Sequence, residues 1–231
     1  QAFVAACSAV VACGRMSLSS LGRVIRGRAR PKHGIKRVDR LLSNPHLRCE
    51  RWILWSVVAS RIVGSVARPV IVLDWTKVID GFYALVAGVA VGGRALTIYA
   101  DVVPEKRAGN RRALLRFIQN LDAVLPTGTR PILVADSQFQ GPFMRAVRDR
   151  GWDYVVRIRG RIRLRAVDGS FHGLNRELFP LAGPRARELG SHRSHGYKGA
   201  PPVTHRLVLV KRHRRRKHWW WKAPRCGTQN N

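Results

Sequence analysis

Two short, uninterrupted runs of apolar residues restrict most strongly what this chain can fold into. The first, Val70-Ile71-Val72-Leu73, opens a strand that we predict over 70–75, and the second, Ile132-Leu133-Val134-Ala135, lies in a strand predicted over 131–135. Apolar side chains at consecutive positions are typical of strands buried on both faces, as in parallel sheets covered by helices. The chain therefore has to supply both further strands and covering helices.

The segments around these runs supply both. Two β-rich segments, 82–91 and 95–101, are joined by Gly92-Gly93, a hairpin signal. Asn110 can cap a helix, a second helix begins near Pro142, and a fifth strand is predicted over 152–158. The order strand, strand, strand, helix, strand, helix, strand predicts an α/β fold whose mixed sheet is ribonuclease-H-like.

The two flanking regions have other patterns. Residues 1–67 are predicted to be helical, with one helix stopped at Ser43-Asn44-Pro45 and another over 50–66. From about residue 159, short β-like pieces at 161–167 and 204–210 lie among Gly, Pro, His and Arg. We therefore expect an N-terminal helical region (1–67), an α/β core (68–158) and a C-terminal β-rich insertion with a basic tail (159–231).

The charge balance points to a polyanionic partner. Lys and Arg total 43 against 13 acidic residues, a formal net charge of +30. Nucleic acid fits best because basic residues that neutralise phosphates release counterions, whereas an anionic membrane surface or a role in solubility is the plainer alternative. Four cysteines in so long a chain suggest a reducing cytoplasm rather than a disulfide scaffold. Arg61, Arg68 and Pro69 interrupt the apolar stretch 52–73, so we expect no membrane association.

Two carboxylates stand out among the few acids. Asp74 and Asp136 each directly follow one of the two apolar runs, and side chains at the carboxyl ends of neighbouring parallel strands gather at one sheet edge. Either residue alone is more simply a turn residue or a helix cap. Together, in so basic a chain, they indicate a site for Mg²⁺, which prefers oxygen ligands and serves phosphodiester cleavage.

Three segments resemble one protein family. Residues 70–76 (VIVLDWT) resemble the first catalytic strand of bacterial insertion-sequence DDE transposases with a long β insertion, and 132–160 resemble the second. The stretch 32–44 resembles the N-terminal region of that group. The resemblance implies that Asp74 and Asp136 are catalytic and bind Mg²⁺ (or Mn²⁺). It also implies water attack at the transposon end and then attack of the freed 3′-hydroxyl on target DNA.

The chain departs from the family pattern twice. Gln138 stands where the family usually has Gly, which puts the turn supporting Asp136 in doubt. The family also places a catalytic Glu after the β insertion, in a Tyr-x-x-Arg-x-x-x-Glu arrangement. Tyr154 and Arg157 fit its first half, but Arg161 occupies the Glu position. We therefore expect no third catalytic acid in this chain, and a truncation before it.

Several other residues are candidates for contacts with DNA. Lys36, Arg37 and Arg40 on the N-terminal helix would contact phosphates, as would Arg157 and Arg159, although each could equally be ordinary solvated surface. The basic run 211–217 with Trp219-Trp220-Trp221 could stack on bases or pack against protein. A zinc site is the weaker hypothesis for His192, His195, His205, His213, His218 and Cys226, because their spacing matches no standard pattern.

Three functions remain open at this point. The first is a nucleoid-associated transposase, homodimeric on double-stranded DNA (transposon ends and target), of which this chain is an inactive fragment. The second is a non-catalytic DNA-binding protein derived from a transposase. The third is a polycation-rich structural protein of the ribosomal kind, a class that has no reason to place acids after two buried strands.

Overall fold

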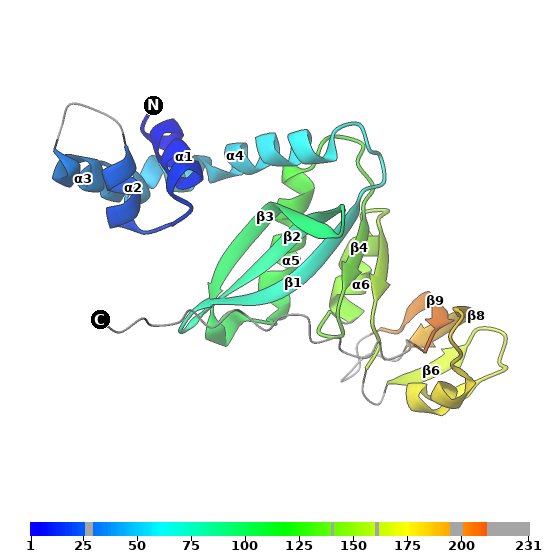
Figure 1. The fold of residues 1–231 in the computed structure, drawn as a ribbon. Coiled ribbons are helices and arrows are strands. Elements are labelled where there is room, and N and C mark those ends of the chain that lie inside the picture. Colours follow the sequence, from blue (N-terminus) through cyan, green and yellow to red (C-terminus); the bar gives the residue numbers. More distant parts are fainter. Residues whose placement is uncertain (26–29, 140, 160–161, 195–200, 212–231) are drawn as a thin grey trace, which may run out of the picture. The chain divides into compact units, whose positions relative to one another are not determined.

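The structure is a computed structural model that describes residues 1–25, 30–139, 141–159, 162–194 and 201–211. It divides into two compact units. The first comprises Gln1–Val134 with Gly151–Asp153, and the second comprises Ala135–Arg150 with Tyr154–Asn231. The helices and strands of both units are labelled in Figure 1. The three domain ranges expected from the sequence stay a prediction.

Four helices begin the first unit: α1 (Ala2–Cys13), α2 (Leu18–Val24), α3 (Pro31–Leu42) and α4 (Pro45–Val63). The predicted stop at Ser43-Asn44-Pro45 is confirmed. Asn44 also starts the next helix, since its side chain accepts the backbone N–H of His46 at 3.0 Å. The helices α1 to α3 pack around Ala9, Leu21 and Val38, which are 7% exposed or less.

The backbones of α2 and α3 cross at two glycines. A Cβ atom on Gly34 would lie 2.1 Å from the carbonyl oxygen of Gly22. A Cβ on Gly22 would in turn lie 2.3 Å from the backbone nitrogen of Ile35. Only glycine fits at either position, because any side chain would overlap the backbone of the facing helix.

A mixed five-stranded sheet follows, with strand order β3-β2-β1-β4-β5. Its strands are β1 (Val70–Ile79), β2 (Phe82–Val91), β3 (Arg94–Pro104), β4 (Ile132–Ala135) and β5 (Asp153–Val156). A short 3₁₀ turn, η1 (Glu105–Arg107), and the helices α5 (Arg111–Val124) and α6 (Gly141–Arg148) lie between these strands in the chain. The predicted order of strands and helices is confirmed, and the fold is the mixed α/β sheet of the ribonuclease-H-like kind.

Hydrogen bonds give the direction of each strand. β1, β2 and β3 form an antiparallel meander that turns at Gly92-Gly93, as predicted. Ile132 N–H donates to Pro69 O at 2.9 Å and Arg130 N–H to Ala67 O at 2.7 Å. Because donor and acceptor advance together by two residues, β4 runs parallel to β1. In the same way, Asp153 N–H donates to Pro131 O at 3.2 Å and Arg157 N–H to Ala135 O at 3.3 Å, so β5 runs parallel to β4.

Helices α4 and α5 cover one face of the meander. Tyr99 of β3 contacts the ring of Phe117 on α5 (centroids 4.9 Å apart) and that of Trp55 on α4 (6.0 Å). Phe117, Ile118 and Leu121 of α5 are at most 1% exposed. The covered face therefore forms the core of the first unit. Helix α4 contributes Trp55 to this core, whereas α1, α2 and α3 pack around a separate cluster.

The second unit contains an antiparallel four-stranded sheet with the order β7-β6-β8-β9. Its elements are β6 (Arg163–Ala166), β7 (His172–Leu174), the 3₁₀ helix η2 (Asn175–Leu181), β8 (Arg187–Ser194) and β9 (Val203–Leu209). The β pieces predicted at 161–167 and 204–210 correspond to β6 and β9. The basic run beyond Lys211 and the three tryptophans lie outside the described residues.

No single helix among the described residues combines the length and apolarity needed to cross a membrane. The pair α1 and α2 meets both requirements only when taken together, and it is bent by 99° at the break between them.

Candidate active site

Asp74 lies within β1 and not at its end. The strand continues to Ile79, because residues 76–79 pair with β2 although they are exposed and carry no continuous apolar run. The predicted end of this strand at residue 75, which placed Asp74 at its carboxyl end, was therefore wrong. Leu73 is 2% exposed on the covered face, whereas Asp74 points to the other face opposite Val86 and is exposed. That position leaves its carboxylate accessible to a ligand.

Asp101 is a second acid on the same meander, but it lies on the covered face. It is 6% exposed, and its carboxylate oxygens lie 3.3 Å from Arg116 Nη2 and 3.5 Å from Arg51 Nη2. Sequence reasoning did not single out this residue. Its alternation with Tyr99 and Val103 along β3 was the available signal for an inward side chain. Its two guanidinium partners make Asp101 a structural residue.

Asp136 directly follows β4, as predicted, and is exposed in the second unit. Its Oδ1 accepts the backbone N–H of Gln138 at 2.9 Å, which closes a tight turn over the next two residues. Gln138 therefore supports Asp136 through its backbone, and the turn forms without glycine. Phe139 anchors the segment, since it is 1% exposed and contacts the ring of Phe143 on α6.

Arg157 directly follows β5 and lies opposite Asp136 on the neighbouring chain segment. Its backbone N–H donates to Ala135 O at 3.3 Å, which in a parallel pair sets Arg157 directly across from Asp136. Residues directly across from each other project to the same face of a sheet. Arg157 is exposed, as is Arg159, two residues further on. An exposed guanidinium beside a carboxylate can bind a phosphate oxygen while the carboxylate binds a metal ion.

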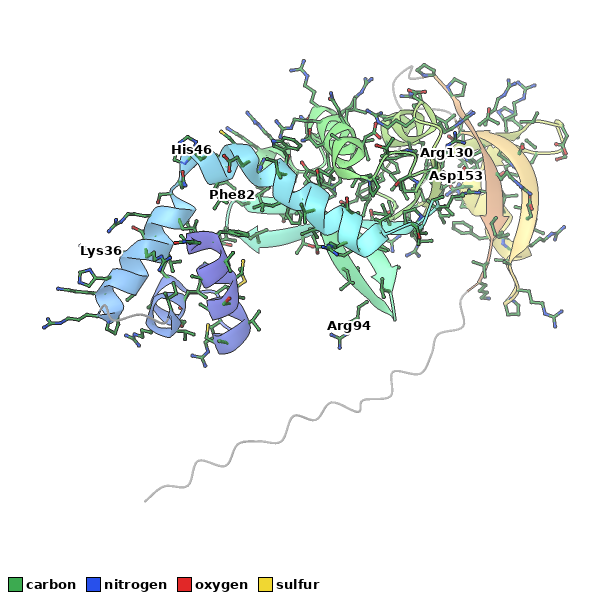
Figure 2. The ribbon with its side chains drawn as sticks, turned by 90° about the horizontal axis from the view of Figure 1, so that it is seen from above. Lys36, His46, Phe82, Arg94, Arg130 and Asp153 are labelled. Atoms are coloured by element: carbon green, nitrogen blue, oxygen red, sulfur yellow. The ribbon has the colours of Figure 1, made fainter. Side chains whose placement is uncertain are left out.

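The basic residues predicted to contact phosphates on α3 form a stripe in the first unit. His33, Lys36, Arg37 and Arg40 recur at the spacing of one helix face, and all are exposed. Val38 lies on the other side and is 1% exposed. Figure 2 shows Lys36 projecting away from α3.

The acids that follow Asp153 in the sequence all have local structural roles. Asp168 Oδ1 accepts the backbone N–H (2.9 Å) and the hydroxyl (2.7 Å) of Ser170, and these bonds lower the pKa of the exposed Asp168 carboxyl. Glu177 accepts the backbone N–H of Leu174 at 3.1 Å, and Glu188 accepts a hydrogen bond from Arg206 Nε at 2.6 Å. Each of these carboxylates already serves the second unit's own fold.

Two of the histidines considered for zinc, His192 and His205, lie opposite each other on neighbouring strands. His192 on β8 is 2% exposed and lies directly opposite His205 on β9. Burial lowers the pKa of His205, and the neighbouring His192 and Arg148 lower it further. No group of three or more potential metal ligands occurs among the described residues. His195, His213, His218 and Cys226 lie outside them.

Comparison with known proteins adds one match. A family model described as "Transposase DDE domain" matches residues 67–219. Comparisons with curated proteins and with solved structures give no match. The matched range begins just before β1 and extends past β9, so it includes both sheets and both predicted acids and leaves out α1 to α4.

Proposed function

Because the chain belongs to the transposase DDE domain family, we propose that Asp74 and Asp136 together hold the divalent metal ion, Mg²⁺ or Mn²⁺, of an insertion-sequence transposase. Transposition is the function of the family, and DNA is its substrate. The finer proposal concerns which residues of this chain serve the metal, the DNA and the pairing of two copies.

One observation carries the metal site. Within the first unit, the hydrogen bond from Ile132 N–H to Pro69 O sets Ile132 across from Val70 in a parallel pair. The same register sets Val134 across from Val72. Asp136 follows Val134 by two residues, as Asp74 follows Val72, and this matching position on two neighbouring strands supports the proposal that both serve one metal ion. Two carboxylates that share a site repel each other unless a cation lies between them.

The donor set fits a hard divalent cation. Both aspartates are exposed and offer carboxylate oxygens, the ligands that Mg²⁺ prefers while it keeps water and phosphate in its shell. When bound, the ion would stabilise the charge that develops on a phosphodiester during cleavage. Arg157 would contribute a positive charge next to Asp136, at a position where a phosphate oxygen could be bound.

We assign DNA backbone contacts to the stripe of Lys36, Arg37 and Arg40 and, beside the metal, to Arg157 and Arg159. Such contacts give affinity and orientation without reading sequence. An insertion sequence has two ends, and a homodimer on DNA would provide one copy for each. The site of action of such a protein is the bacterial nucleoid.

We further propose that this chain, on its own, binds DNA without cutting it. The family pattern places the third metal-binding acid later in the chain than Asp153. The three acids found there, Asp168, Glu177 and Glu188, each accept a hydrogen bond from another residue of the second unit. The chain would then act as the non-catalytic DNA-binding derivative of a transposase.

Metal binding provides the direct test. Mn²⁺ titration followed by electron paramagnetic resonance should show a bound ion in the parent chain. Asp74→Asn and Asp136→Asn should each weaken its binding by about tenfold or more. Asp80→Asn is the matched control, since Asp80 is an exposed aspartate in the turn between β1 and β2, where it forms an ion pair with Lys77. Equal binding by all three variants would remove the metal site from the proposal.

Cleavage provides the second test. Supercoiled plasmid incubated with the parent chain and Mg²⁺ should remain intact, while a gel-shift assay shows binding. Nicking by the parent that disappears in Asp74→Asn would contradict the non-cutting proposal and show that another group supplies the missing ligand.

A further inference from the structure

In the four-stranded sheet of the second unit, basic side chains occupy one register row on β6, β7 and β8, and a threonine completes the row on β9. Arg165 on β6 lies directly opposite His172 on β7 and directly opposite Arg193 on β8. Arg193 in turn lies opposite Thr204 on β9. Because residues in one register row project to the same face, these four side chains form a continuous line across all four strands.

The line lies on the outer face of the sheet. Leu164, Ala166, His192 and Val203 alternate with the row and are 3% exposed or less, so they form the inner face. Arg165, His172 and Arg193 are exposed, as is Arg163, two residues before Arg165 on the same strand and the same face. We call Arg163, Arg165 and Arg193 the arginine face.

This arrangement works against the stability of the sheet on its own. Arginines directly opposite each other on neighbouring strands repel, because their Cβ atoms lie only about 4.5–5.5 Å apart. Glu188 is the one carboxylate on the outer face within the described strands, and Arg206 binds it at 2.6 Å. Among the described residues no ion pair involves a member of the arginine face. An external anion bound to these residues would offset the repulsion.

We propose that the arginine face binds the phosphate backbone of double-stranded DNA. Guanidinium groups spread over neighbouring strands match a line of phosphates better than a single small anion, and each can donate two parallel hydrogen bonds to phosphate oxygens. The partner rests on the proposed function, which supplies DNA. The surface itself goes beyond that proposal, since it is made of other residues than those assigned there on α3, at Arg157 and Arg159, and at the two aspartates.

A pair of double variants tests this surface. Arg165→Gln with Arg193→Gln removes two charges from the arginine face. The control, Arg94→Gln with Arg107→Gln, removes two exposed charges from the first unit, where Arg94 projects from the tip of the β2–β3 hairpin (Figure 2). Binding to a short duplex is measured by fluorescence anisotropy over a range of salt concentrations.

The variant of the arginine face should bind about tenfold more weakly at low salt. Its slope of log affinity against log salt should fall by about 1.8, since each lost phosphate contact contributes about 0.9. The control should keep the parent's affinity and slope. An equal loss in both double variants would show diffuse attraction by the net charge and would overturn the proposal.

Thermal unfolding without DNA separates binding from a structural role. Removing the opposed charges should leave the unfolding temperature of the Arg165→Gln, Arg193→Gln variant unchanged or raise it, most clearly at low salt. A lowered unfolding temperature together with weaker binding would show that the arginines hold the sheet together, which contradicts the proposal.

Two further outcomes concern the identity of the partner. A parent chain that fails to bind duplex DNA would contradict the proposed function and this inference together. A parent that binds DNA only through residues outside the arginine face would contradict this inference alone. Tighter binding of polyglutamate than of the duplex would point to an acidic protein partner and would also overturn it.

Discussion

At the scale of single residues, the face of the sheet decides what an aspartate does. Asp74 and Asp101 belong to the same antiparallel meander and have opposite surroundings. Asp74 is exposed and opposite an aliphatic neighbour, whereas Asp101 is 6% exposed and shared by Arg51 and Arg116. A change at Asp74 should therefore affect metal binding, and a change at Asp101 should affect stability.

Asp101→Asn tests this distinction. The amide keeps the shape of the side chain but loses the charge that Arg51 and Arg116 bind, so the free energy of unfolding should fall by about 1–3 kcal/mol. Urea denaturation followed by circular dichroism measures the loss. Asp74→Asn should leave the denaturation midpoint unchanged, and a loss of stability in that variant equal to that of Asp101→Asn would contradict the distinction.

His205 gives the second unit a pH dependence. Both ring nitrogens are buried and have no hydrogen-bond partner among the described residues, and its pKa lies below the ordinary 6.5. The unfolded chain therefore binds a proton more readily than the folded one. Stability should be complete above about pH 6.5 and should fall as the pH decreases toward the lowered pKa of the folded state.

The experiment follows thermal unfolding between neutral and mildly acidic pH in the parent chain and in His205→Leu. The leucine variant should lose less stability on acidification. His172→Gln, which changes an exposed histidine of the same sheet, should follow the parent. Parallel curves for the parent and the leucine variant would show that another group controls the acid response.

At the scale of elements, the crossing of α2 and α3 depends on glycine. Alanine in place of Gly34 would favour the helix by about 1 kcal/mol through propensity alone. Its Cβ would, however, lie 2.1 Å from the backbone oxygen of Gly22, which cannot move without separating the helices. The steric effect outweighs the propensity, and Gly34→Ala should destabilise the three-helix cluster by about 1–3 kcal/mol or more.

Hydrogen exchange of the α1 to α3 amides measures this effect, and protection should fall there while it persists in β1 to β3. Gly141→Ala is the matched control. A Cβ there would meet Arg145 Nη1 at 3.5 Å, which is ordinary contact. Unchanged protection in Gly34→Ala would mean that the two helices can part at little cost.

The helices and strands differ in how well the sequence predicted them. β2 matches its predicted bounds, and the capping role of Asn110 is confirmed, because apolar runs, the Gly92-Gly93 turn and a helix cap act locally. β7 and β8 were missed. β8 carries His192 inward and Arg193 outward, so the alternation of apolar and polar residues that marks a strand is absent.

Some features of the candidate site could likewise be predicted from the sequence, and others could not. Asp74 and Asp136 could be named from the sequence because each directly follows an apolar run. The extension of β1 beyond Asp74 could not be predicted from the sequence, since it depends on pairing with β2. The inward position of Asp101 and the opposition of Arg165 and Arg193 depend on register, which is a property of paired strands and not of one segment.

At the scale of the whole molecule, a net charge of +30 should make stability depend on ionic strength. Like charges repel over about 30 Å at 0.01 M salt but only about 10 Å at 0.1 M, and the compact state brings them closer than the unfolded chain does. Added salt should therefore raise the unfolding temperature. Two different monovalent salts should act alike at equal ionic strength, because screening depends on concentration and not on the kind of ion.

Duplex DNA should raise the unfolding temperature further at low salt, since a polyanion neutralises the charge locally and binds the folded surfaces more tightly than the unfolded chain. This increment should shrink as salt increases, because counterion release then contributes less to binding. Differential scanning fluorimetry with and without a short duplex, at several salt concentrations, measures both effects. A DNA increment that is independent of salt would contradict phosphate contacts as the source of affinity and would favour contacts with the bases.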